Sequence, residues 1–446
     1  MDPLDPRDGG SVSSRGNVEL VFPPDVRFTC SRCGDCCRGW HVMLGPGEAE
    51  RLASLDWSGV APDLRGTSPV APVPGEPQSG RMALARKADG ACVYLGSENQ
   101  CRIHESFGEA AKPLLCRLYP FGFFEVGERV AVDVSFACRA VSRDQGEPLS
   151  RRVPEWSRLL QDAPVAKKPH KFSRKHDVSG DLLWELEHHL VSILSDESLS
   201  LLDRVRAAFE FNRLATTSDP STEAARILRD VLARGIPRQI RERPLEPGSE
   251  QMDKTGRAVF FHMLFLMLNP TPDELFSMPA KARGREAGFR VQAADGYKLP
   301  EAHPLVDNRE RRVTFGEVGR IATGSVLSGP GAELLARYLR AKILGQRFMR
   351  EGDKEIPLVE AVPRLLLLFP IAVWTAKLLA CERGEASIEE DDVRGALRLV
   401  DRSYGEIRLS ALPPKPRKAW RFVLLETDLP VTASVEMLAY NSAHSR

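Results

Sequence analysis

The sequence lacks the features of a membrane protein and of a highly charged nucleic-acid binder. Its most apolar stretch covers residues 365–376, only twelve residues with Pro370 among them. A spanning helix needs about 20 apolar residues, so this stretch predicts a buried core helix. The 62 Lys and Arg residues are balanced by 61 Asp and Glu residues, which gives a formal charge of +1. We therefore expect no membrane partner, and a nucleic-acid partner is disfavoured.

Motifs of several enzyme classes are also missing. The chain has no G-x4-G-K-[ST], no G-x-S-x-G and no H-E-x-x-H sequence. These absences disfavour P-loop NTPases, α/β-hydrolases and zinc proteases. The N-terminus carries Asp2, Pro3 and Asp5 where a secretion signal needs a basic start and an apolar stretch. The sequence thus predicts a cytoplasmic protein, whose thiols stay reduced.

Eight of the nine cysteines lie between Cys30 and Cys138. Residues 30–37 read C-S-R-C-G-D-C-C, which is C-x2-C-x2-C followed at once by a fourth cysteine. Two-residue gaps let a turn direct successive thiolates at one centre, and Gly34 is free to adopt the positive φ of such a turn. In a reducing compartment this pattern predicts a metal site rather than disulfides.

The spacing favours an iron–sulfur cluster over zinc. It is similar to the first three ligands of a ferredoxin-type site, whereas zinc sites more often use two separated C-x2-C pairs, and no second pair follows here. Cys36 and Cys37 would point to opposite sides in an extended segment, so we expect only one of them to join the Cys30 and Cys33 centre. At least three sulfurs should converge on one centre. Cys381, alone in an apolar stretch, is expected to be a core residue.

The predicted fold class is α+β. Residues 1–17 look disordered, residues 18–145 should form a cysteine-cluster domain, and residues 154–446 should form a larger, mainly helical domain. Residues 61–80 contain five prolines and predict an exposed, extended insertion. Residues 282–313 are polar and irregular.

Local patterns predict individual elements. A short strand is expected within residues 17–28. Segments 121–126 and 129–134 flank Gly127-Glu128, which suits a two-residue hairpin that would return Cys138 toward Cys116. A capping box, Ser387-x-x-Glu390, should open a helix. Apolar residues at helical spacing predict further helices over or near residues 180–195, 202–209, 222–234, 256–268 and 335–343.

Four segments together resemble one known family. They are FTCSRCGDCC from Phe28, DGACVYL from Asp89, CRIH from Cys101 and CRLYPF from Cys116. In this order they resemble the CxxCxxCC, or YkgJ-type, cysteine-cluster family, which is described as zinc- or iron-chelating. The run from Cys37 through Trp40 into HVMLGPGEAERL looks more like the flagellin lysine-N-methylase branch of that family. Lys112-Pro113 stands where the compact family form has Arg-Pro.

The resemblance implies a metal-binding function and a set of ligands. The candidate metal ligands that it implies are Cys30, Cys33, Cys36, Cys37, Cys92, Cys101, Cys116 and Cys138. The implied cofactor is a 4Fe-4S iron–sulfur cluster, with zinc as the alternative. The methylase branch further implies S-adenosylmethionine and a lysine-bearing, flagellin-like protein substrate. The chain has no G-x-G-x-x-G loop for that cofactor, so this part rests on likeness alone. The alternative is a non-enzymatic protein with a structural metal and a helical interaction domain.

Other side chains beside the cysteines have two interpretations. His41 and His104 either reach the site or, as we favour, pack partly buried near it. Arg38, Arg102 and Arg117 would offset thiolate charge or bind an anionic group of a substrate. Trp40 and Tyr119 are more often core residues than stacking platforms. Residues 167–175 hold five Lys and Arg residues and are expected to be a solvated linker between domains.

Overall fold

The computed structural model describes most of the chain. The described residues are 12–13, 19–39, 42–57, 68–73, 80–160, 170–215, 219–268, 313, 315–351, 354–404 and 414–439. Of the N-terminal residues expected to be disordered, 12 and 13 form a strand, so that prediction is wrong there, and the others lie outside the described residues. The irregular segment 282–313 lies outside them too, except for Val313.

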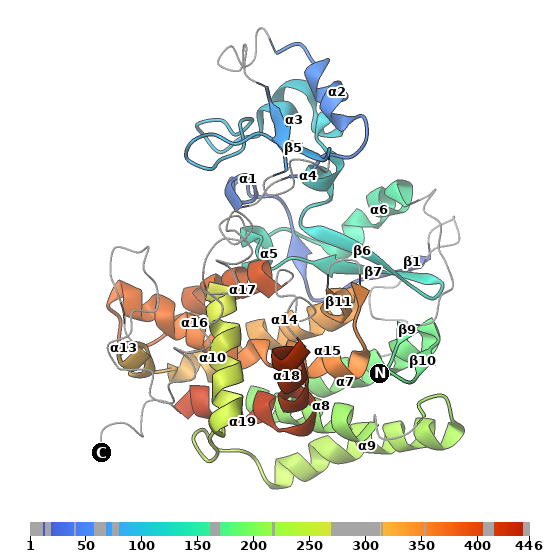
Figure 1. Cartoon of the computed structure of the whole chain (residues 1–446), viewed down its shortest axis with the longest axis vertical. Helices are drawn as coiled ribbons and strands as arrows, with labels where there is room; N and C mark the ends of the chain where they lie inside the picture. The colour runs from blue at the N-terminus through green and yellow to red at the C-terminus, as the bar shows by residue number, and fades with distance from the viewer. Residues whose placement is uncertain are drawn as a thin grey trace.

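A four-stranded sheet lies between the cysteine-rich part of the chain and a stack of helices (Figure 1). Its order is β1 (Val12–Ser13), β2 (Glu19–Val21), β7 (Arg129–Val134) and β6 (Phe121–Val126). β6 and β7 pair antiparallel over their whole lengths, and β2 runs parallel to β7. Gly127 has a φ of 63°, as the first position of a two-residue hairpin turn of this kind requires, so the expected hairpin is confirmed.

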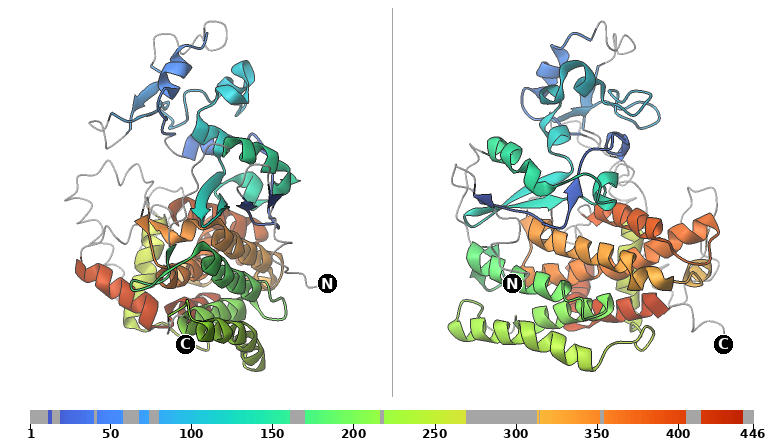
Figure 2. Two further views of the ribbon diagram at one scale, coloured as in Figure 1. Left: turned by 90° about the vertical axis from the view of Figure 1, so that its right-hand side faces the viewer. Right: turned by 180° about the vertical axis from the view of Figure 1, so that it is seen from behind.

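The part of the chain above the sheet has its own small core. We call residues 42–118, as far as they are described, the module. Its elements are α2 (Glu48–Ala53), β4 (Val70–Pro72), β5 (Met82–Leu84), α3 (Arg102–Phe107) and α4 (Leu114–Leu118). Six buried side chains form its core: Val42, Leu52, Leu84, Val93, Tyr94 and Ile103. The module projects away from the helices in all three views (Figures 1 and 2).

The proline-rich insertion contributes to the module. Residues 70–72 are extended, as expected, but they pair with β5 in an antiparallel ribbon, with Val70 opposite Leu84. Val42 is part of the small core, and its carbonyl accepts a hydrogen bond from the Leu84 backbone N–H at 2.9 Å. The described part of the insertion is therefore integrated into the module and is not a free linker.

Most of the remaining helices lie below the sheet, and we call the sheet together with all the helices outside the cysteine loop and the module the body (Figure 1). Its helices are α5 (Arg139–Ser142), α6 (Val153–Leu159), α7 (Gly180–Leu194), α8 (Leu201–Ala215), α9 (Glu223–Glu242), α10 (Lys254–Leu268), α13 (Phe315–Gly319), α14 (Pro330–Gly345), α15 (Leu358–Leu366), α16 (Leu368–Arg383), α17 (Glu390–Tyr404), α18 (Pro414–Glu426) and α19 (Leu429–Ala439). Short strand pairs complete it: β3 (Arg27–Phe28) with β8 (Glu147–Pro148), β9 (His170–Lys171) with β10 (Asp177–Val178), and β11 (Arg350–Glu351) with β12 (Lys354–Glu355). The chain is therefore α+β, with a cysteine-containing part followed by a larger helical part.

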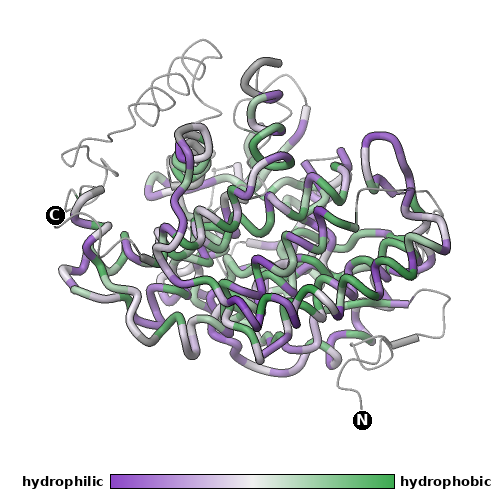
Figure 3. The backbone as a smooth tube through the Cα atoms, turned by 90° about the horizontal axis from the view of Figure 1, so that it is seen from below, coloured by the Kyte–Doolittle hydropathy of each residue, from purple (hydrophilic) through white to green (hydrophobic). Residues whose placement is uncertain are grey.

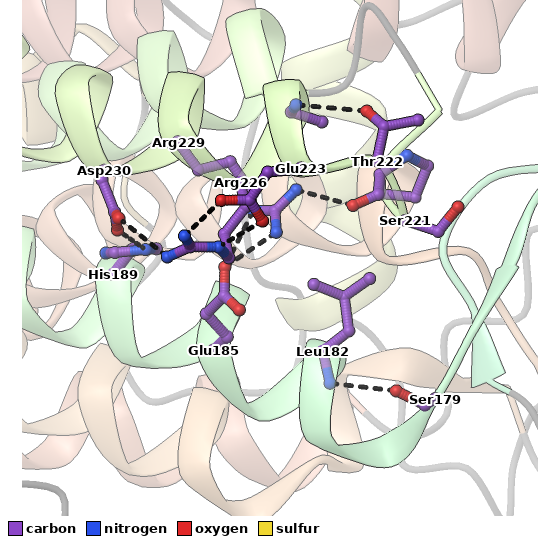
Figure 4. A network of polar contacts seen from close by, with 12 residues as sticks. Ser179, Leu182, Glu185, His189, Ser221, Thr222, Glu223, Arg226, Arg229 and Asp230 are labelled. Carbon is purple, nitrogen blue, oxygen red and sulfur yellow. Dashed lines mark hydrogen bonds and ion pairs between the residues drawn. The ribbon is translucent and has the colours of Figure 1, made fainter.

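Side chains cap the first turns of α7 and α9. The Ser179 hydroxyl accepts a hydrogen bond from the Leu182 backbone N–H at 3.3 Å, and Thr222 does the same for Ala225 at 3.1 Å (Figure 4). The buried Arg229 then joins α9 to α7 by donating to Glu185 at 2.7 Å. Seen from below, polar and apolar residues alternate along the body's helices, as expected for helices with one face in a core (Figure 3).

One helical stretch of the body is, by length and composition, long and apolar enough to cross a membrane. It is Leu358–Arg383, which comprises α15 and α16, and 89% of its most apolar window is buried inside the structure. Trp374 and Leu378 in α16 have no exposed surface. The expectation of a buried core helix is therefore confirmed, and Cys381 is buried in the same helix, as expected.

Two local expectations are corrected. Ser387 does not cap α17, because it forms a β-bridge with Ala322. Instead α17 begins at Glu390, and the Asp392 carboxylate accepts a hydrogen bond from the Glu389 backbone N–H at 2.8 Å. The described part of the basic segment, residues 170–175, is not a solvated linker. It belongs to the β9–β10 hairpin, where Lys171 pairs with Asp177 at 2.7 Å.

A buried ion network ties the sheet to the helices. The ammonium of Lys342 in α14 lies 3.1 Å from an Asp133 carboxylate oxygen in β7 and 2.8 Å from one of Asp401 in α17. It also donates to the Val134 carbonyl at 2.8 Å. Burial acts to lower the pKa of Lys342, but the charges of Asp133 and Asp401 outweigh it and the pKa lies above its usual value. The network keeps this lysine charged and places α17 against the end of β7.

Candidate metal site

The cysteine loop turns sharply at Gly34. This residue has a φ of 76°, a conformation that favours glycine, and a Cβ atom there would also displace the end of the Arg38 side chain, whose Nη1 would lie 2.6 Å away. The Gly34 carbonyl accepts a hydrogen bond from the Cys37 N–H at 3.0 Å. The turn leads directly into α1 (Asp35–Gly39), which carries both Cys36 and Cys37.

The premise that Cys36 and Cys37 lie in an extended segment is therefore wrong. On the helical turn of α1 their sulfur atoms lie 4.0 Å apart and share a hydrogen bond. Two thiolates bound to one tetrahedral zinc, each at 2.3 Å, would be separated by about 3.8 Å. The spacing of this pair therefore suits two ligands of a single ion.

The cysteines lie where the two cores meet. Cys138 is buried in the large core of the body, at the N-terminal end of α5. Cys92, Cys101 and Cys116 pack against the small core of the module. The backbone N–H of Cys92 donates to the Cys37 carbonyl at 2.7 Å, which joins the module to the cysteine loop. Cys30 is exposed.

The thiols nearest the loop influence one another electrostatically. The hydrogen bond with Cys37, burial and the charge of Cys37 raise the pKa of Cys36 far above its usual value. Burial raises the pKa of Cys138 to about 11, and the charges of Cys33 and Cys36 act in the same direction. These four thiols therefore lie close enough to repel one another as thiolates.

The module's thiols join the same network. Burial raises the pKa of Cys92 to about 11, with a contribution from the charge of Cys101. Burial and the charges of Cys92, Cys101 and Cys36 raise the pKa of Cys116. Cys116 thus links the module's thiols to those of the loop. Such a set ionises readily only when a cation offsets the repulsion, which is what a thiophilic metal ion does.

Some of the positive charges that act on these thiols were not singled out by the sequence. Lys112 acts against the rise in pKa at Cys36 and Cys116, and Lys87 and Arg86 act against it at Cys92. Arg38 instead donates to the Asn99 side chain at 2.7 Å. Lys112 belongs to the Lys112-Pro113 pair by which the chain departs from the compact family form.

Two other expectations concern residues beside the cysteines. His104 is exposed on α3 rather than partly buried, and Trp40 and His41 lie outside the described residues. Tyr119 is partly buried against the large core, as expected. Burial and the charges of Cys138, Cys36, Asp401 and Cys33 raise its pKa, so its ring lies among the loop thiols and the end of α17.

The expected convergence of three sulfurs is not found in the part of the chain that the structure describes. No group of three or more His, Cys, Asp or Glu side chains there is arranged to hold one metal ion. In the described residues, a hydrogen bond between two cysteine sulfurs is found for Cys36 and Cys37, which lie 4.0 Å apart. Metal binding would therefore require the loop and module cysteines to move together.

The donor set is that of a site for zinc or iron, because soft thiolates favour these metals. In agreement, residues 29–138 match the sequence model of the CxxCxxCC family, described as a "putative zinc- or iron-chelating domain". This stretch of the chain has the family's cysteine-cluster domain, which confirms the resemblance to the family. The match does not distinguish the branches of the family, so the likeness to the flagellin lysine-N-methylase branch stays a prediction.

One curated relative is an uncharacterized protein, MJ0939, of Methanocaldococcus jannaschii. It is 29% identical over 105 residues, which is 23% of this chain and 32% of that protein. The chain thus matches about a third of the relative's length. No solved structure matches the chain.

Proposed function

We propose that this protein binds a zinc or iron ion through thiolates of its cysteine loop and module, at the boundary between the two cores. The observation that carries the proposal is the 4.0 Å approach of the Cys36 and Cys37 sulfurs, within a network of thiols that raise one another's pKa. Bound metal would replace this repulsion by attraction and connect a small module to a large body. In the cytoplasm, which we propose as its location, these thiols stay reduced.

Metal and sulfide analysis of the intact protein, purified without oxygen, tests the proposal. We expect at least one zinc or iron per chain, and loss of that metal in a Cys36→Ala, Cys37→Ala double variant. Iron with an equal amount of inorganic sulfide would identify an iron–sulfur cluster, and zinc without sulfide a single-ion site. Protein that contains no metal, and takes up neither Zn²⁺ nor Fe²⁺ after reduction, would contradict the proposal.

Methyl transfer to a protein lysine remains a prediction of the resemblance to the methylase branch. Titration of the metal-loaded protein with S-adenosylmethionine tests it by calorimetry. Saturable heat would support an enzyme, and its absence would favour the alternative, a structural metal with a helical interaction domain.

A further inference from the structure

An aspartate inside the cysteine loop is held by two arginines from other parts of the chain. Asp35 lies between Cys33 and Cys36 and is three-quarters buried. One carboxylate oxygen accepts from Nε of Arg139, the residue after Cys138, at 3.1 Å. The same oxygen accepts from Nη2 of Arg398, which lies on α17.

Side chains of helix α17 also form hydrogen bonds with the segment that leads into Cys138. Nε of Arg398 donates to the Ala137 carbonyl at 3.5 Å. One turn further on, the Asp401 carboxylate accepts from the Ser135 hydroxyl at 2.9 Å and from the Ala137 N–H at 3.3 Å. Arg398 therefore contacts two cysteine-bearing segments, the loop through Asp35 and the Cys138 segment through Ala137.

We propose that Arg398 is a positioning residue for metal binding, which ties the cysteine loop to the Cys138 segment so that both can contribute to one ion when the module's cysteines move toward them. The inference rests on the proposed function. Arg139 directly follows Cys138, so the two arginines together fix Asp35, and with it the turn that carries Cys36 and Cys37, against the Cys138 segment. Arg398 lies far outside residues 29–138, so the helical part of the chain completes the cysteine domain.

If Arg398 only stabilised the fold, its loss would lower the free energy of unfolding. The Arg398 and Asp35 side chains are 31% and 25% exposed, and ion pairs with this much solvent access contribute little to folding stability. Losing Arg398 should therefore weaken metal binding without unfolding the protein. Lysine in its place keeps the charge but cannot reach Asp35 and Ala137 together, so it should restore binding only in part.

The test measures Zn²⁺ affinity of the full-length protein by competition with a chelator. Arg398→Gln should bind Zn²⁺ about tenfold more weakly than the wild type, as expected for loss of an outer partner of a metal ligand. Arg394→Gln is the matched control, because Arg394 lies on the same helix with similar exposure and pairs with Glu390 and Asp391 instead. It should bind like the wild type. The thermal unfolding of the metal-free Arg398→Gln variant should also be unchanged.

A double-mutant cycle sharpens the result. Asp35→Asn should weaken binding to a similar extent, and the double variant should lose clearly less than the sum of the two single losses, since both remove the contact between Asp35 and Arg398. Additive losses, an affinity of Arg398→Gln within twofold of the wild type, or an equal loss in Arg394→Gln would each overturn the inference and leave the metal-binding function standing. Failure of the wild type to bind Zn²⁺, or Fe²⁺ without oxygen, would overturn both.

Discussion

The module and the body are held together by different means. In the described residues the core cluster of the module holds six buried side chains, whereas the large core of the body runs through β7 and most of its helices. Apolar burial contributes roughly 25 cal/mol per Å², so a core as small as the module's stabilises it weakly. The module also contributes three thiols to the boundary with the body. We therefore expect burial to stabilise the body, and the module to depend more on the metal that we propose its cysteines bind.

The largest expected effect comes from removing a loop cysteine. Cys33→Ala should abolish metal binding and make the module sensitive to protease while the helical body stays intact, because the module loses its link to the body. Metal analysis and limited proteolysis measure both effects. Cys381→Ala, buried in α16 away from the site, should leave metal content unchanged. Equal metal loss in the two variants would refute the assignment of ligands.

Breaking the ion network of the body should cost roughly 3–5 kcal/mol of unfolding free energy. Lys342→Met leaves the buried Asp133 and Asp401 without their cation. Urea denaturation should show a lower midpoint for the body. Lys171→Met is the control, since its exposed pair with Asp177 should contribute less than about 1 kcal/mol. Similar midpoints for the two variants would show that the network does not stabilise the body.

Replacing a second buried lysine, Lys377, should stabilise the protein, whereas replacing Lys342 should destabilise it. In the described structure Nζ of Lys377 has no hydrogen-bond partner, and burial lowers its pKa to about 8. Unfolding therefore takes up a proton between about pH 8 and the ordinary value of 10.5, so the free energy of unfolding rises with pH across this window and is lowest below it. Lys377→Met should stabilise the protein at pH 7 by up to about 3 kcal/mol and remove this pH dependence. Unfolding curves at pH 7 and pH 10 measure both, and a destabilised variant would contradict the assignment.

The smallest expected effect concerns the loop backbone. Gly34→Ala forces an alanine into left-handed φ and against Arg38, at a cost of about 1–2 kcal/mol. Gly47→Ala, which lies in the module and has a similar φ of 74°, has open space around it. Both variants should be mildly destabilised, but only Gly34→Ala should also bind Zn²⁺ more weakly. Normal Zn²⁺ binding by Gly34→Ala would mean that the turn does not position the cysteines.

Much of the fold could be predicted from local patterns. The β6–β7 hairpin follows from alternating apolar residues around Gly127-Glu128, and α14 follows from its apolar stripe after Pro330. The start of α17 could not be predicted, because both Ser387 and Asp392 fit a capping pattern and only the β-bridge of Ser387 to Ala322 distinguishes them. The helical setting of Cys36 and Cys37 was missed for a similar reason, since five residues of helix leave no periodicity to detect.

The sequence by itself determined the α+β class, the cysteine-rich N-terminal part and the family of that part, because spacing and composition are local properties. Only the tertiary structure placed the thiols at the boundary of two cores and brought Arg398 of α17 to Asp35 in the cysteine loop. These two residues are 363 positions apart. No pattern in the chain encodes contacts over such a separation, because they arise from the packing of complete elements against one another.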